Sequence, residues 1–165
     1  LIQCTEYLLT LIGKKFGMKT NNSIRNLLPK DKDQWEKLYR DYANFYKVEM
    51  NDKILNTLWN WVNDKNHEIE AIVYEVDGNI VAFAHYRRMP RPLKGQDIGF
   101  LDDLFVDIDH RGQKIGEKIL NELKKISKTK KWNLIRWITR NDNIRAKSLY
   151  DKVAEKTSWD LYELK

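Results

Sequence analysis

The sequence is poor in cysteine, histidine and long apolar runs, and each shortage excludes a class of protein. The single cysteine, Cys4, excludes a disulfide framework and zinc sites built from two or four cysteines. The histidines His67, His85 and His110 never stand four residues apart, so no HExxH-type metal site is present. No apolar run reaches the length of a membrane-spanning helix. We therefore expect a cytoplasmic protein that works without a bound metal.

The chain does have enough apolar bulk for one folded domain, and a modest excess of positive charge. Its 165 residues are 42% hydrophobic and 33% charged, a balance typical of a globular protein. A domain of this length buries roughly 70% of its unfolded surface. Thirty Lys and Arg against 24 Asp and Glu give a net charge of +6. This excess favours an anionic partner: nucleic acid, a membrane surface or a phosphorylated cofactor.

The first 17 residues differ in pattern from the rest of the chain. Their apolar stretch precedes the basic pair Lys14-Lys15, whereas a signal peptide carries its basic residues first. Met18 and the polar residues after it look like a natural start. We expect residues 1–17 to be an upstream or disordered segment and residues 18–165 to form the only domain.

Hydrophobic periodicity predicts an α/β domain with the element order β-α-α-β-β-β-α-β-α-β. Apolar residues that alternate with polar ones mark strands, and apolar residues spaced by three and four mark helices. Asp77-Gly78 predicts a hairpin turn, and the proline-containing stretch 88–95 predicts a loop. The predicted strands are 23–28, 69–76, 80–86, 100–108, 134–139 and 159–164; the predicted helices are 31–46, 51–62, 116–126 and 143–153. This order gives a mixed central sheet with helices on both faces.

One strand–turn–helix segment carries most of the chemical information. The strand 100–108 runs into a basic, glycine-containing turn that opens a helix. The N–H groups of such a turn and of the helix N-terminus form an anion cradle suited to a pyrophosphate. Arg111 and Lys114 would add charge-assisted hydrogen bonds, while Gly112 and Gly116 would let phosphates approach the backbone. On the turn alone, a phosphate cradle and an ordinary turn with packing glycines are equally good interpretations.

The segment resembles the acetyl-CoA signature of the GNAT superfamily of N-acetyltransferases, whose turn reads Arg/Gln-x-x-Gly-x-Gly/Ala. Here it reads Arg111-Gly112-Gln113-Lys114-Ile115-Gly116, so Lys114 replaces the first signature glycine. A lysine presents its own N–H to a phosphate there if its φ is negative, and its ammonium adds charge. Further along, Asn143-Ile144-Arg145-Ala146-Lys147-Ser148-Leu149-Tyr150 is similar to the family's second hallmark, Asn-x-x-Ala-x-x-Leu/Phe-Tyr. The resemblance extends from Ser23 to Leu164.

This resemblance implies a single GNAT-like domain that transfers the acetyl group of acetyl-CoA to an amine, with no metal. Acetyl-CoA would bind as a co-substrate where the strand 101–106 splays from the strand 134–139. Asn143 would contact its pantetheine arm, and the Tyr150 hydroxyl would protonate the departing thiolate. The residues that the resemblance places at acetyl-CoA are Leu104, Phe105, Val106, Arg111, Gly112, Gln113, Lys114, Ile115, Gly116, Glu117, Asn143 and Ala146.

Asp102 and Asp103, on the strand before the turn, are the candidate catalytic bases. A primary amine with a pKa of about 10.4 is protonated at neutral pH and cannot attack until it loses a proton. A carboxylate can take that proton through a water molecule. Because the two residues are neighbours on a strand, we expect them on opposite faces, with only one in the cleft. His85, at a strand end, is expected to be a solvated edge residue.

The identity of the amine is the least determined feature. The strand before the turn and the C-terminal segment resemble the branch that includes polyamine acetyltransferases, while histone-type and amino-acid acetyltransferases are also similar. The region that forms the substrate wall in this family contains Tyr42, Phe45, Tyr46 and Glu49. We expect a small-molecule amine such as a polyamine or amino acid, with no nucleic acid or membrane partner, and allow for a homodimer. A protein (lysine or N-terminal) acetyltransferase and a catalytically silent acyl-CoA-binding domain stay open as alternatives.

Overall fold

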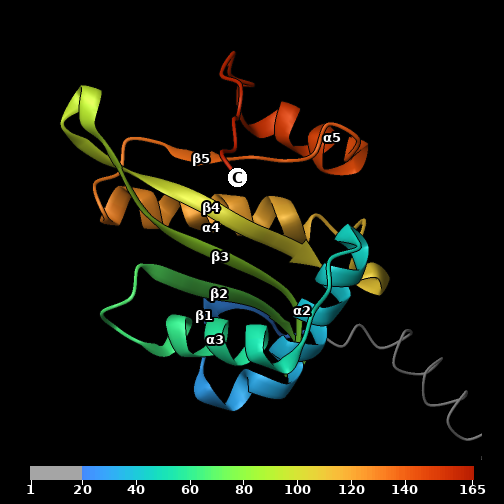
Figure 1. The fold of residues 1–165 in the computed structure, drawn as a ribbon. Coiled ribbons are helices and arrows are strands. Elements are labelled where there is room, and N and C mark those ends of the chain that lie inside the picture. Colours follow the sequence, from blue (N-terminus) through green and yellow to red (C-terminus); the bar gives the residue numbers. More distant parts are fainter. Residues whose placement is uncertain (1–19) are drawn as a thin grey trace, which may run out of the picture.

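The computed structural model describes residues 20–165, so the predictions for residues 1–17, Cys4 included, lie outside the described part. Figure 1 shows a twisted sheet with helices against both of its faces. The strands are β1 (Asn22–Asn26), β2 (Ile69–Val76), β3 (Asn79–Arg91), β4 (Gln96–Val106) and β5 (Ile135–Trp137). The helices are α2 (Lys32–Tyr46), α3 (Asp52–Asn63), α4 (Ile115–Thr129) and α5 (Ile144–Val153), with 3-10 turns η1 (Pro29–Asp31), η2 (Pro92–Lys94) and η3 (Ile108–His110). The predicted α/β class is confirmed.

The sheet has the order β1-β2-β3-β4-β5, with antiparallel pairs throughout except for the parallel pair β4–β5. β5 pairs with β4 at three positions only, from Gly99–Ile135 to Leu101–Trp137. β4 continues to Val106 without this neighbour. The two strands diverge beyond Leu101 (Figure 1), which is the splay that the sequence predicts.

Two apolar layers hold the helices to the sheet. On one face, Ile119 and Leu123 of α4 pack against small residues of β3 such as Ala84. On the other face, Leu38 of α2 packs against Phe83. These residues recur at the helical spacing of three and four on α2 and α4, which is why the sequence pattern located both helices. The sheet is therefore covered on both faces, as predicted.

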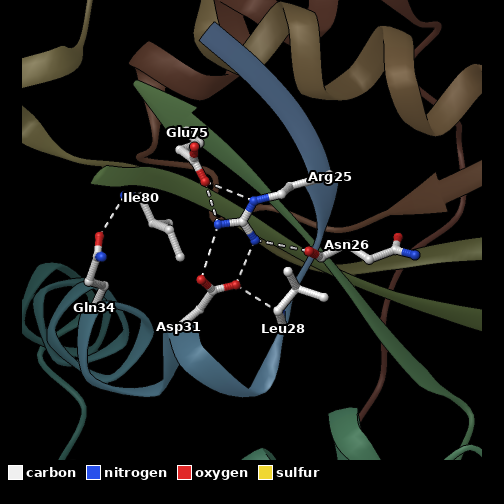
Figure 2. A network of polar contacts seen from close by, with 7 residues as sticks. All are labelled: Arg25, Asn26, Leu28, Asp31, Gln34, Glu75 and Ile80. Carbon is white, nitrogen blue, oxygen red and sulfur yellow. Dashed lines mark hydrogen bonds and ion pairs between the residues drawn. The ribbon is translucent and has the colours of Figure 1, made fainter. Parts of the chain in front are cut away.

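Three side chains fasten β1 and η1 to β2, as Figure 2 shows. The Arg25 guanidinium donates to both Asp31 oxygens at 2.6 and 3.0 Å and to Glu75 Oε2 at 2.8 Å. Asp31, whose side chain is 3% exposed, also accepts the Leu28 N–H. Asp31 stands at the N-cap position of α2, but its carboxylate bonds to Arg25 and not to the helix. Burial alone would raise the pKa of Asp31, but the hydrogen bonds from Arg25 and the Leu28 N–H, together with the charge of Arg25, lower it below its ordinary value.

The predicted last strand, 159–164, is wrong: residues 154–165 form neither helix nor strand. Its apolar residues are exposed, Trp159 at 76% and Leu164 at 103%. A strand needs a neighbour for its backbone groups and a surface against which to bury one face. The nearest sheet edge in the fold is β5, and its three residues offer little of either.

The predicted loop 88–95 is also partly wrong, because β3 continues as a strand to Arg91 and only η2 interrupts the hairpin. β2 pairs with β3 no further than Arg87. Beyond that point β3 has one free edge, and such an edge tolerates Pro90. Within residues 20–165, no helix has the length and apolar character of a membrane span, and no three His, Cys, Asp or Glu side chains cluster as metal ligands.

Candidate active site

A β-bulge in β4 places both candidate bases on one face of the sheet. His85 lies opposite Asp103 and Tyr86 lies opposite Leu101, so Asp102 is an extra residue in β4. Asp103 contacts His85, and Asp102 contacts Arg87. His85 and Arg87 are two residues apart on β3 and so point to the same face. The expectation that the two aspartates lie on opposite faces is therefore wrong, because the bulge breaks the alternation.

Asp103 belongs to a buried hydrogen-bonded network under α2. The Trp35 indole donates to His85 Nε2 at 3.1 Å, which makes that nitrogen an acceptor and leaves the proton on Nδ1. Nδ1 then donates to Asp103 Oδ2 at 2.9 Å, and the Tyr39 hydroxyl donates to the same oxygen at 3.3 Å. Burial raises the pKa of Asp103, but His85 and the neighbouring tyrosine hydroxyls together outweigh it and hold the pKa below its ordinary value. Such a carboxylate is a weak base.

His85 itself is not the solvated edge residue that the sequence suggests. Its side chain is 1% exposed, because β3 is a central strand and α2 covers this face. Both ring nitrogens have partners within the protein. His85 therefore orders Asp103 and the helix above it.

Asp102 has the environment of a usable base. Its side chain is 27% exposed, and Oδ1 accepts from Arg87 Nε at 3.2 Å. The other oxygen, Oδ2, is buried 3.2 Å from the same Arg87 Nε and makes no hydrogen bond with the described residues. Burial raises the pKa of Asp102 above its ordinary value, against the attraction of Arg87 and with a further contribution from the charge of Asp103. Of the two candidates, Asp102 is therefore the more exposed and the one whose pKa is raised.

The turn before α4 presents a row of unpaired N–H groups. Within residues 20–165, no backbone or side-chain oxygen accepts a hydrogen bond from the N–H groups of residues 112–117; the first bonded one is that of Lys118. Gly112 has φ +86° and Lys114 has φ +59°. The negative φ under which the lysine was expected to present its N–H is therefore not found, and Lys114 adopts a left-handed conformation that favours glycine. The row of donors at a helix N-terminus fits the phosphates of acetyl-CoA.

Arg111 is fixed beside this row. Its Nε donates to the Val106 carbonyl at 3.0 Å, and its guanidinium lies 5.4 Å from the Phe45 ring centre and 5.5 Å from that of Phe105. Burial and the neighbouring charge of Arg145 lower the pKa of Arg111. Arg145 was missed by sequence reasoning, although it lies inside the second hallmark, two residues after Asn143.

Several residues that the resemblance places at acetyl-CoA use their side chains elsewhere. Phe105 and Ile115 are buried in the two core layers, and Leu104 and Val106 are partly buried against the α4 layer. The side chains of Phe105 and Ile115 are therefore unavailable to a ligand, and those of Leu104 and Val106 are only partly available. A Cβ on Gly116 would lie 3.1 Å from Leu149, so this glycine lets α4 pack against α5. Gln113 is exposed, whereas Glu117 and Ala146 are half-buried.

Asn143 and Tyr150 lie on the β5 side of the splay. Asn143 Oδ1 accepts from the Ala146 N–H and caps α5, while Nδ2 donates to the Tyr46 hydroxyl at 3.3 Å. The Tyr150 ring packs edge-on against Trp137, which pairs with Leu101 immediately before Asp102. Burial, with a contribution from Tyr46, raises the pKa of Tyr150 to about 12, so it stays a proton donor at neutral pH. No described residue hydrogen-bonds the Tyr150 hydroxyl, which leaves it free for a ligand.

Comparison with known proteins gives a consistent assignment. The model of the acetyltransferase (GNAT) family matches residues 33–154. The D-amino-acid N-acetyltransferase HPA3 of Saccharomyces cerevisiae is 27% identical over 142 residues, which cover 85% of this chain and 88% of that protein.

Solved structures show the same fold. A ribosomal-protein-alanine N-acetyltransferase from Brucella melitensis biovar Abortus 2308 has a TM-score of 0.76 at 24% identity, covering 88% of this chain and 99% of its own. Aminoglycoside N-acetyltransferase AAC(6')-Iy in complex with CoA has a TM-score of 0.75 at 14% identity, covering 90% and 97%. Because the family model spans most of the chain, including the turn and the Asn143–Tyr150 segment, this protein belongs to the GNAT family of acetyltransferases.

Proposed function

We propose that this enzyme transfers the acetyl group of acetyl-CoA to the primary amine of a small molecule, by direct attack in a ternary complex. GNAT acetyltransferases use acetyl-CoA, and the aminoglycoside neighbour holds CoA. The observation that carries the proposal is the position of Asp102 and Tyr150. Asp102 directly follows Leu101 on β4, and the Tyr150 ring packs against Trp137, the β5 residue that pairs with Leu101. Both residues are therefore next to the last β4–β5 pair, beyond which the strands part.

Asp102 starts the reaction in this proposal. Its carboxylate takes a proton from the ammonium of the bound substrate through a water molecule, which leaves the nitrogen lone pair free. The nitrogen bonds to the thioester carbon as the carbon–sulfur bond breaks, and an N–H of β4 near Leu104 supports the charge on the carbonyl oxygen. Tyr150 gives its hydroxyl proton to the departing sulfur. The second amine proton restores the Tyr150 hydroxyl, and Asp102 releases its proton to solvent. The nitrogen attacks the thioester directly, so no group on the enzyme is acylated.

The turn and α5 bind the co-substrate. The N–H groups of residues 112–117 and the charges of Arg111 and Lys114 hold the phosphates. Asn143 Nδ2 donates a hydrogen bond to the pantetheine arm. Acetyl-CoA supplies the activated acyl group. Every other part of the chemistry, namely orientation and the movement of protons, comes from this chain's own residues.

A thiol-release assay tests the proposal. Acetyl-CoA is offered with amino acids, polyamines, aminoglycosides and basic peptides, and free CoA thiol is followed. We expect thiol release with one small-molecule class and none with peptides. Binding of acetyl-CoA without thiol release for any amine would instead show a silent acyl-CoA-binding domain, and release with peptides alone would show a protein acetyltransferase.

The pH profile of the active class then tests the base. Protonation of Asp102 should lower kcat/KM as the pH falls through its raised pKa. Asp102→Asn should lower turnover at neutral pH and recover part of it at high pH, where free amine is present without help. A variant with unchanged turnover at neutral pH would remove Asp102 from the mechanism.

A further inference from the structure

We infer that Arg87 and Asp102 together form the amine-substrate site, and that the substrate is an α-amino acid held by both its carboxylate and its ammonium. This inference rests on the proposed function and narrows its substrate class. It comes from an ion pair that the β-bulge creates next to the reaction site. In this pair each partner keeps hydrogen-bonding capacity that the protein does not use.

Arg87 presents an unused guanidinium edge. Its Nε donates to Asp102 at 3.2 Å, and among residues 20–165 nothing accepts from Nη1 or Nη2. The guanidinium lies over the Phe100 ring at 4.9 Å, which fixes its plane. Its side chain is 31% exposed, so a ligand can reach it. Two parallel N–H groups in a fixed plane match a carboxylate, which accepts them as a bidentate pair.

Asp102 presents the opposite charge beside this edge. An ionised carboxylate has about four acceptor positions, and Arg87 occupies one of them. Oδ2 is buried beside Arg87, and Oδ1, which accepts one hydrogen bond from Arg87, has a second acceptor position. An ammonium has three N–H donors and no acceptor, so it complements Oδ1. The adjacent positive and negative groups thus match an α-amino acid, whose ammonium and carboxylate are attached to one carbon.

The same pair disfavours a polyamine. A polyamine carries only positive charges, and Arg87 would repel it beside the carboxylate that should attract it. The other aspartate adds no free acceptor, because His85 and Tyr39 already donate to Asp103. A mostly apolar groove of about 450 Å³ is lined by Ile54, Leu58 and Trp61 of α3 and by Tyr39 of α2, whose hydroxyl contacts Asp103.

The test compares an amino acid with its amide, for example phenylalanine and phenylalaninamide in both D and L forms. The amide lacks the negative charge but keeps the side chain and the amine. Its amine is less basic, so free base is more abundant and basicity alone would favour the amide. We expect kcat/KM to be about 10- to 100-fold higher for the amino acid than for the amide.

Arg87→Gln should remove most of this discrimination, mainly through a higher KM for the amino acid. Arg88→Gln is the matched control: this neighbour points to the other face, is half exposed and contacts Asp97, so discrimination should persist. A melting curve confirms that each variant is folded. Wild-type enzyme that acetylates the amide as well as the amino acid would overturn the inference and leave the proposed function intact. Absence of thiol release with every amine would instead overturn the proposed function.

Discussion

The strands β1 to β4 pair along most of their lengths, whereas β5 pairs with β4 at three positions. The side built on β1 to β4 contains fully buried residues such as Trp35 and Phe83, together with the Arg25 network. On the other side, α5 has no buried residue, and the chain after it is exposed. The proposed substrate site thus lies on a tightly packed scaffold, while Asn143 and Tyr150 lie on a weakly packed one.

This contrast suggests how the two sides are held together. In the described residues, the Asn143–Tyr46 hydrogen bond and the Gly116–Leu149 packing are among the few contacts that connect α5 to the rest. A ligand with phosphates on the turn and a pantetheine arm at Asn143 would add contacts on both sides. Binding to the folded state alone stabilises a protein in proportion to the logarithm of ligand concentration over Kd. The weakly packed side is therefore where acetyl-CoA should protect the chain most.

The largest expected effect is on turnover, on the weakly packed side. Tyr150→Phe keeps the ring against Trp137 and removes only the hydroxyl. Because the pKa of Tyr150 is raised to about 12, the wild-type hydroxyl holds its proton until the sulfur departs. Turnover should fall by roughly 10²- to 10⁴-fold, with the Kd of acetyl-CoA little changed. Steady-state kinetics and calorimetry measure the two quantities separately. A stable variant with wild-type turnover would exclude the acid role.

The next effect is on stability, on the tightly packed side. Arg25→Ala leaves Asp31 buried without its cation, so the free energy of unfolding should fall by about 3 kcal/mol. Urea denaturation followed by fluorescence measures this loss. The network lies away from the aspartates of β4, so the kinetic constants of the folded fraction should stay near those of the wild type. A loss below about 0.5 kcal/mol would mean that solvent already screens the network.

The pH dependence of stability is the control for that variant. Asp31 has a lowered pKa, so its contribution is present above the ordinary value of 3.8 and is lost as the pH falls through the folded-state value. Wild-type stability should therefore decline in acid more steeply than that of Arg25→Ala. Equal slopes would show that other carboxylates dominate acid unfolding.

On the tightly packed side, the sequence predicted the regular helices more reliably than it predicted the irregular features of the strands. The apolar stripes of α2 and α4 follow from spacing alone, because burial imposes a period. The bulge at Asp102 has no such signal: it depends on how β3 and β4 pair, and it reverses the expected faces of the two aspartates. The predicted exposure of His85 was wrong for a similar reason. The burial of a strand residue depends on which strand is central in the sheet. The predicted last strand, 159–164, does not form because these residues have no neighbouring strand with which to pair.

A smaller effect separates two roles of Asn143. Asn143→Ala removes the cap of α5 and should cost about 1 kcal/mol of stability. Asn143→Asp keeps an oxygen for the Ala146 N–H but loses the amide that donates to Tyr46. Acetyl-CoA should bind more weakly to both variants, whereas only the alanine variant should lose stability. Thermal melts and calorimetry give the two readings; unchanged binding in both would confine Asn143 to capping.

The smallest effect concerns Lys114, which joins the two sides at the start of α4. A left-handed lysine is strained by about 1–2 kcal/mol relative to glycine, and glycine loses about 0.5–1 kcal/mol through its freer unfolded chain. Lys114→Gly should therefore stabilise the protein by about 0.5–1 kcal/mol, measured as a higher urea midpoint. Lys114→Ala is the matched variant, since it removes the same ammonium but keeps a side chain at positive φ. The two should bind acetyl-CoA equally weakly at low salt if the ammonium contacts a phosphate, and only the glycine variant should gain stability. Equal stability in the two would mean that the turn relaxes its strain without glycine, and the positive φ would then carry no cost.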